Sequence, residues 1–197
     1  MLSKETILGQ IQDVYKEKGY KFFTGDMSVN VFAIRCETGT DSFDDLVGLA
    51  YYNAGNLTVD LYKGTTEPGQ HWLKNPMREE GCAIMKEGQY LGVYKVGPHG
   101  GSQYEACRQY GPISVYRDNN KDGKHDLDDT TVQTGVFMTN LHHGYSSWRV
   151  HKNSAGCIVI QNKDEFFDEF MPVIKESCDI HGEKFSFTLL NKNDFDA

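Results

Sequence analysis

Short runs of apolar residues, separated by turn sequences, make up most of this chain. Residues 29–35 alternate loosely and are rich in β-branched residues, a pattern typical of strands. The segments 45–52 and 57–62 flank Asn53–Asn56, an Asn-Ala-Gly-Asn sequence that favours a tight hairpin turn. Further predicted strands are 29–35, 82–85, 90–96, 113–116, 132–141, 157–161 and 185–190. So many short strands predict a mainly β fold, a β-sandwich or an open barrel.

Residues 4–18 are predicted to form a helix that precedes the strands. Ser3 can cap its first turn and Gly19 can end it. Apolar residues recur on one face of this helix and are Ile7, Ile11, Val14 and Tyr15. We therefore divide the chain into an N-terminal helical segment, residues 1–25, and a main domain, residues 26–197.

A second helix is predicted after the strand 157–161. Asn162 and Glu165 have the spacing of a capping box, and Pro172 is expected to kink the helix or to end its first part. The apolar face of this helix consists of Phe166, Phe167, Phe170 and Ile174. Elsewhere, residues 72–76 are predicted to form a loop and residues 191–197 a frayed tail.

Composition argues against several classes of protein. The 197 residues include 20 Lys or Arg and 28 Asp or Glu, giving a net charge of −8, so a nucleic-acid-binding surface is not expected. No apolar run approaches the ~18 residues of a membrane-spanning helix, and the first residues lack the pattern of a signal peptide. The five cysteines are widely spaced, odd in number and without a CxxC pair, which favours reduced thiols and synthesis in the cytoplasm.

An acidic stretch, residues 118–129, matches a twelve-residue calcium loop. The ligand positions 1, 3, 5, 7, 9 and 12 are filled by Asp118, Asn120, Asp122, Lys124, Asp126 and Asp129. Gly123 stands at position 6, where the loop turns sharply, whereas His125 replaces the usual apolar residue at position 8. No helices are predicted on either side of it. The stretch is therefore either a structural calcium site or a solvated acidic loop that binds no ion.

Cys157 is the residue whose surroundings best suit catalysis. Ser154, Ala155 and Gly156 precede it, and an apolar run follows. Small residues let a carbonyl substrate approach the backbone, so the N–H groups of Gly156 and Cys157 are candidates for an oxyanion hole. The remaining cysteines are interpreted as small core residues and are Cys36, Cys82, Cys107 and Cys178.

A cysteine nucleophile needs a base, and three histidines lie upstream of Cys157. His142 is fifteen positions before it, at the end of a predicted strand. His143 would point to the other face of that strand, and His151 lies in a polar loop. Asn140 or a loop carbonyl can orient the imidazole ring. Spacing alone leaves all three histidines as candidates.

The sequence His142-His143-Gly144, followed by Ser154-Ala155-Gly156-Cys157, resembles the catalytic motif of the L,D-transpeptidase (YkuD-like) family. It is most similar to a divergent branch of that family in phage and bacterial proteins, with weaker similarity at 65–69, 97–99, 115–118 and 134–137. Over residues 29–175 the resemblance implies a mainly β fold, Cys157 as the nucleophile and His142 as the base. It also implies that Ser154 and Gly156 shape the oxyanion hole, that the substrate is a peptidoglycan stem peptide, and that the chemistry needs no cofactor.

The chain differs from that family beside the cysteine. Ala155 replaces the usual second histidine, and Ile158-Val159 lacks the arginine or asparagine that often follows the nucleophile. The carboxylate of a stem peptide must then be held elsewhere, and the candidates are Arg149, His99 and His143. Arg149 is explained equally well as a solvated loop charge.

These patterns support hypotheses from different classes of protein. The first is an enzyme that cleaves or transfers stem peptides through a thioacyl-enzyme, made in the cytoplasm and acting on the cell wall after release, as a phage lytic enzyme does. The second is a calcium-stabilised binding or structural module that keeps a degenerate site. The third is a cysteine hydrolase with another substrate. Attack of water on the thioacyl-enzyme would give hydrolysis, and attack of an amine would give transpeptidation.

Overall fold

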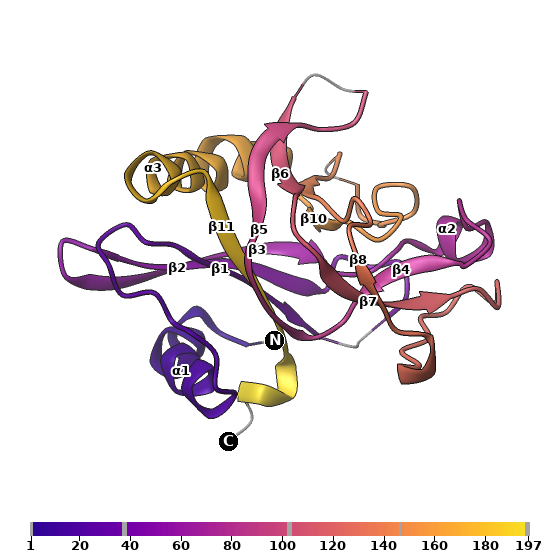
Figure 1. The fold of residues 1–197 in the computed structure, drawn as a ribbon, viewed down its shortest axis with the longest axis horizontal. Helices are drawn as coiled ribbons and strands as arrows, with labels where there is room; N and C mark the ends of the chain where they lie inside the picture. The colour runs from indigo at the N-terminus through magenta and orange to yellow at the C-terminus, as the bar shows by residue number, and fades with distance from the viewer. Residues whose placement is uncertain (1, 37–38, 102–103, 146, 196–197) are drawn as a thin grey trace.

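Eight strands of the computed structural model close into a barrel in the order β1-β11-β5-β6-β9-β10-β3-β2 (Figure 1). These strands are β1 (Asn30–Arg35), β2 (Asp45–Asn53), β3 (Asn56–Thr65), β5 (Gly88–Pro98), β6 (Glu105–Gln109), β9 (Leu141–His143), β10 (Ile158–Ile160) and β11 (Lys184–Asn191). The structure describes residues 2–36, 39–101, 104–145 and 147–195. The predicted mainly β fold is confirmed, and the barrel is closed.

A smaller sheet packs beside the barrel and lies to its right in Figure 1. It contains β4 (Cys82–Met85), β7 (Ile113–Asp118) and β8 (Gln133–Gly135), in the order β4-β7-β8. Met85 and Val115 of this sheet belong to the same buried apolar cluster as Leu141 and Ile158 of the barrel. The two sheets therefore share one core, and the seam between them is fixed by packing.

The β2–β3 hairpin shows why the turn sequence was informative. Asn53 pairs with Asn56, and the two central residues have positive φ, 48° at Ala54 and 81° at Gly55. Such a two-residue turn matches the right-handed twist of the strands that it joins. The hairpin prediction is confirmed, although both strands extend beyond the predicted ends.

Helix α1 (Lys4–Glu17) covers part of the outer barrel surface, next to the short 3₁₀ helix η3 (Lys192–Phe195) (Figure 1). The Ser3 side chain accepts the N–H of Thr6, so the predicted cap is confirmed. All four residues of the predicted apolar face are buried. The prediction of a frayed tail is wrong for residues 191–195. Phe195 is buried in the cluster that α1 forms with the barrel, while residues 196–197 lie outside the described part.

The second predicted helix is present but begins as a π-helical segment. This segment, η2 (Glu165–Phe170), continues into α3 (Met171–His181), and Pro172 stands in the first turn of α3, where a missing N–H costs least. Asn162 Oδ1 accepts the N–H of Asp164, so the predicted pairing with Glu165 is replaced by a tighter local turn. Phe166, Phe170 and Ile174 are buried against the barrel core.

Two segments differ from the prediction. Residues 70–74 form a short helix, α2 (Gln70–Lys74), although 72–76 was predicted to be a loop. The predicted strand 132–141 is divided between the two sheets, because β8 belongs to the small sheet and β9 to the barrel. Met138 lies in the crossing segment with a positive φ of 63°, which interrupts extended pairing.

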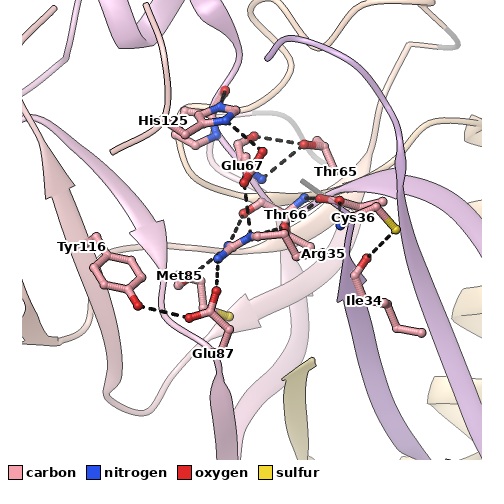
Figure 2. Close-up of polar contacts among 12 residues, drawn as sticks. Ile34, Arg35, Cys36, Thr65, Thr66, Glu67, Met85, Glu87, Tyr116 and His125 are labelled. Carbon is pink, nitrogen blue, oxygen red and sulfur yellow. Dashed lines mark hydrogen bonds and ion pairs between the residues drawn. The ribbon is translucent and has the colours of Figure 1, made fainter. Parts of the chain in front are cut away.

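A buried ionic cluster joins the barrel to the acidic loop (Figure 2). Arg35 on β1 is fully buried and forms ion pairs with Glu67 (3.2 Å) and Glu87 (2.6 Å). His125 approaches Glu67 with Nδ1 (2.9 Å) and the Pro68 carbonyl with Nε2 (2.9 Å). Both groups can only accept hydrogen bonds at neutral pH, so both ring nitrogens of His125 must carry protons. Figure 2 shows Glu67 between Arg35 and His125, where it serves both cations.

The charge on His125 predicts a pH-dependent stability. Burial lowers the His125 pKa, but its bonds to Glu67 and Pro68 outweigh burial and leave the pKa above its ordinary value of 6.5. A histidine whose pKa is higher in the folded state than in the unfolded state stabilises the fold. This stabilisation is complete at a pH below the unfolded-state pKa and is lost as the pH rises through the folded-state pKa. We expect the free energy of unfolding to fall over the pH range that begins near the ordinary value of 6.5 and ends above the raised His125 pKa, and this decrease to be smaller in His125→Gln. Urea unfolding across this range measures both curves, and identical slopes would contradict the charged state of His125.

No helix among the described residues has the length and apolar character needed to span a bilayer.

Candidate active-site cleft at Cys157

A cleft of about 540 Å³ opens at the seam between the barrel and the small sheet, and Cys157 lies in its wall. Strands β4 and β7 contribute one side of the cleft, through Ala83 and Arg117. The segments 137–139 and 155–157 contribute the other side. Cys157 is therefore accessible where the shared core meets solvent.

The turn before Cys157 is held by a close backbone contact. Gly156 has a φ of 129°, and a Cβ on it would lie 2.3 Å from the Ala83 carbonyl oxygen. Only glycine fits both this conformation and this distance. The Ser154 hydroxyl accepts the N–H of Gly156 (3.1 Å) and donates to the Cys157 carbonyl (2.7 Å). Ser154 and Gly156 thus fix the position of Cys157 against the small sheet.

These contacts bear on the predicted oxyanion hole. In this conformation the Gly156 N–H already donates to Ser154, so it would serve a tetrahedral intermediate only after that bond shifts. Ser154 is buried beneath the turn and does not line the cleft. The geometry therefore gives Ser154 a positioning role. The Cys157 N–H is the other candidate donor to the oxyanion.

The Cys157 side chain is a protonated thiol in this conformation. Its Sγ lies 3.6 Å from the Met138 carbonyl oxygen, to which a thiol can donate. Burial raises the Cys157 pKa to about 11, and the backbone N–H of Asn140 opposes this shift. The residue as a whole is half-buried, so we assign the raised pKa to the sulfur's own surroundings rather than to a closed site.

This pKa predicts the pH dependence of thiol alkylation. Since the thiolate is the reactive form, the iodoacetamide rate at Cys157 should rise about tenfold for each pH unit and level off only near pH 11. Peptide mapping by mass spectrometry can follow this cysteine alone, with the half-buried Cys178 as an internal comparison. A plateau below pH 8 would instead mean that the free protein already holds a thiolate, and it would contradict this pKa.

His142 lies on β9, the strand that pairs in parallel with β10, and its register partner is Val159. Its Nδ1–H donates to the His143 carbonyl (2.8 Å), because a carbonyl can only accept. The lone pair of the neutral ring is therefore on Nε2. Burial, and secondarily His99, lowers the His142 pKa to about 3, so the ring is neutral at physiological pH. His142 thus has the protonation state of a general base.

The structure brings His142 and Cys157 onto neighbouring segments without a direct contact between them among the described residues. The carbonyl of Asn140, two residues before His142, accepts the N–H of Ile158, the residue after Cys157. The ring of His142 instead packs on His99, with ring centres 4.2 Å apart. Catalysis would require the thiol and the imidazole to come together, and the catalytic roles remain predictions. Hydrogen bonds of this kind are often incomplete in ligand-free enzymes.

His142 is buried and does not line the cleft, and neither do the remaining candidate histidines or Arg149. His143 is buried among aromatic rings, with Tyr104 at 4.5 Å and Phe167 at 5.1 Å between ring centres. His99 stacks on Tyr104, with ring centres 5.2 Å apart, and its other ring contact is His142. Arg149 is exposed on a separate pocket, where its guanidinium lies over Trp148. His151, the third candidate base, packs near His71 at a ring distance of 5.4 Å.

Sequence reasoning did not assign a role to Arg117, which lines the cleft with Arg78, Phe137 and Met138. Arg117 is on β7 at the same alternating positions as Ile113 and Val115, two residues of the core. The sequence could have indicated this role, because Arg117 is a charged residue at the next position on the buried face of the strand. Arg78 and Met138 lie in irregular segments, where no periodicity marks them.

The acidic loop brings together some of its predicted ligands. Asp118 is buried, and its Oδ1 has no partner among the described residues, while Oδ2 accepts the N–H of Asp126 (3.2 Å). Asn120 donates to Asp126, and Lys86 forms an ion pair with Asp129. Within the described residues no cluster of three His, Cys, Asp or Glu side chains has a metal-binding arrangement. Asp129, at the predicted ligand position 12, therefore pairs with Lys86 in this conformation. Asp118 and Asp126, at positions 1 and 9, lie next to each other.

Comparison of the chain with protein-family models, curated proteins and solved structures finds no match.

Proposed function

We propose that this protein is a cysteine-dependent enzyme that processes peptidoglycan stem peptides, and that it is a divergent relative of the L,D-transpeptidases. The carrying observation is that Cys157 lies in the wall of a cleft, directly after a turn fixed by Ser154 and by the Gly156–Ala83 contact. The sequence resemblance and the neighbouring His142 add to it. The substrate class rests on that resemblance, and the cleft provides the space that a peptide substrate needs.

The chemistry has two steps. Nε2 of His142 takes the thiol proton, and the Cys157 sulfur attacks an amide carbonyl, with backbone N–H groups holding the oxyanion. The leaving amine takes the proton from His142 as the C–N bond breaks, which gives a thioacyl-enzyme. Water or an acceptor amine then attacks the thioester, and the thiol is restored. Binding of the substrate must drive the rearrangement that brings Cys157 and His142 together.

Mass spectrometry of muropeptides tests this proposal. Purified peptidoglycan is incubated with the wild-type protein and with Cys157→Ala. We expect shortened stem peptides or new cross-links only with the wild type, since shortened stems indicate hydrolysis and new cross-links indicate transfer. His142→Ala should lower the rate about 10²- to 10⁴-fold, the usual contribution of a general base.

Cys178→Ala is the matched control, because Cys178 is also a half-buried free thiol but lies outside the cleft. Its muropeptide profile should equal that of the wild type. Products that persist in Cys157→Ala, or no products with any variant, would remove the peptidoglycan assignment.

A calcium-stabilised binding or structural module is the second candidate function. The buried, unpartnered Asp118 Oδ1 favours it, because a calcium ion would satisfy that oxygen together with those of Asn120, Asp122, Asp126 and the Lys124 carbonyl. Calcium binding should then raise the free energy of unfolding, by about 2.7 kcal/mol at a hundred times the dissociation constant. Both functions are compatible, because the loop and the cleft involve different residues.

Calorimetric titration with calcium tests the loop. We expect heat of binding with the wild type and none with Asp118→Ala. Asp129→Asn should retain binding, because the Asp129 carboxylate pairs with Lys86 and not with the other predicted ligands among the described residues. Absence of heat with the wild type would show that the acidic stretch is a solvated loop.

A further inference from the structure

The charge of the Cys157 cleft is opposite to that of the protein. The chain has 28 acidic and 20 basic residues, yet the described residues that line the cleft include Arg78 and Arg117 and no Asp or Glu. A cavity whose charged side chains have one sign concentrates ligands of the opposite sign. The cleft thus favours an anionic group close to the reactive sulfur.

Arg117 is held in place by contacts that leave much of its guanidinium unused. Nε donates to the Gln133 side chain (2.9 Å), and Nη1 donates to the Gly81 carbonyl (3.3 Å). The guanidinium also lies over the Phe137 ring at 4.7 Å. These two hydrogen bonds occupy two of its five N–H groups, and no described residue accepts from Nη2, so both of its N–H groups are left to donate. The head group is therefore oriented before a ligand arrives.

Arg117 also lacks a counter-ion. Among the described residues no carboxylate lies within ion-pair distance of its guanidinium. Burial lowers the Arg117 pKa, and Glu80 acts in the opposite direction from a greater distance. The guanidinium stays charged, because its ordinary pKa lies far above neutral. A half-buried charge without an internal partner is stabilised when an external anion binds it.

We propose that Arg117, assisted by Arg78, binds a carboxylate of the acyl donor and thereby selects peptides that carry a free carboxylate near the amide attacked by Cys157. This inference rests on the proposed function of Cys157. The planar guanidinium matches a carboxylate through two parallel hydrogen bonds, a geometry that lysine does not reproduce. Arg78, which is exposed, adds a second positive charge at the cleft.

A stem peptide carries two carboxylates that Arg117 could bind. One is the terminal α-carboxylate, and the other is the side-chain carboxylate of the diamino acid. Three synthetic stem tetrapeptides distinguish them: one with both carboxylates free, one with the terminus amidated and one with the side chain amidated. Turnover by the wild type should depend on one of these carboxylates, with KM raised about 10- to 100-fold when that group is amidated. The same loss is expected for Arg117→Gln on the free peptide, with kcat changed little.

The variants are chosen so that a folding defect does not imitate a binding defect. Arg117→Lys retains the charge and should still lose most of the affinity, while Arg78→Gln alters an exposed residue and should raise KM by a smaller factor. Lys95→Gln is the control, because Lys95 lies outside the cleft and pairs with the exposed Glu183. The thermal midpoint of each variant is measured alongside. Equal KM values for amidated and free peptides in the wild type would overturn the inference.

A binding measurement separates this inference from the proposed catalysis. Calorimetry with Cys157→Ala and the free tetrapeptide needs no turnover. Binding that is lost in Cys157→Ala/Arg117→Gln would support the carboxylate site even if no peptide is cleaved. Turnover that is insensitive to Arg117 would retain the enzyme and remove the carboxylate site.

Discussion

Replacement of Gly156 by alanine should lower the free energy of unfolding by about 3 kcal/mol and displace Cys157 from the cleft. A Cβ at this position would lie 2.3 Å from the Ala83 carbonyl oxygen, and the φ of 129° is one that residues with a side chain rarely adopt. Backbone strain and overpacking each cost about 1–3 kcal/mol. Because the clashing atom belongs to the backbone of β4, relief requires the turn and the small sheet to separate.

Gly9→Ala is the matched control for this substitution. Gly9 lies in the exposed part of α1, and a Cβ there meets nothing within 4 Å. Alanine should therefore stabilise the protein by about 0.5–1 kcal/mol, the opposite sign. Denaturant unfolding gives both values, and alkylation of Cys157 in Gly156→Ala reports the altered environment of the thiol. A Gly156→Ala protein as stable as the wild type would contradict the close contact between the turn and β4.

Arg35→Ala should destabilise the protein by about 3–5 kcal/mol, because it leaves buried carboxylates without their cation. Arg35 has no exposed surface, and it pairs with Glu67 and Glu87 while donating to the Met85 carbonyl (2.9 Å). Glu67 would keep His125 as its remaining charged partner. The loss of these ion pairs should destabilise the place where β1, the turn after β3 and the acidic loop meet.

Two comparisons locate the source of this effect. Lys4→Ala removes the exposed pair with Asp60 and should cost less than about 1 kcal/mol. Arg35→Ala/Glu87→Gln also removes one of the two carboxylates that lose their cation, and it should recover part of the stability. Urea unfolding of the four proteins gives the free energies. An Arg35→Ala cost near that of Lys4→Ala would mean that water reaches the cluster.

Local patterns predicted the elements whose causes are local. The β2–β3 hairpin follows from two adjacent residues with positive φ, and α1 follows from one cap and one apolar face. The turn from Ser154 to Cys157 was recognisable because small residues imply a close backbone approach, although the partner, Ala83, is 73 residues away (156 − 83).

The features that the sequence did not reveal depend on distant partners. Division of the predicted strand 132–141 between two sheets depends on pairing with β7 and β10, which a single run of residues does not encode. Burial of Phe195 depends on α1 at the other end of the chain. Arg117 on β7 lines the same cleft as Cys157, which lies 40 residues further along the chain (157 − 117). In the Arg35–Glu67–His125 cluster, His125 has a structural partner outside the predicted calcium loop.

Trapping of the thioacyl-enzyme is the most direct test of the central claim that Cys157 is an acylated nucleophile. The wild-type protein is mixed with a synthetic stem tetrapeptide, quenched in acid within the first turnover and examined by intact-protein and peptide mass spectrometry. The account predicts one acyl adduct on the peptide that contains Cys157, absent in Cys157→Ala and unaffected in Cys178→Ala. Cleavage of the tetrapeptide with no adduct on Cys157, or with equal cleavage by Cys157→Ala, would contradict it.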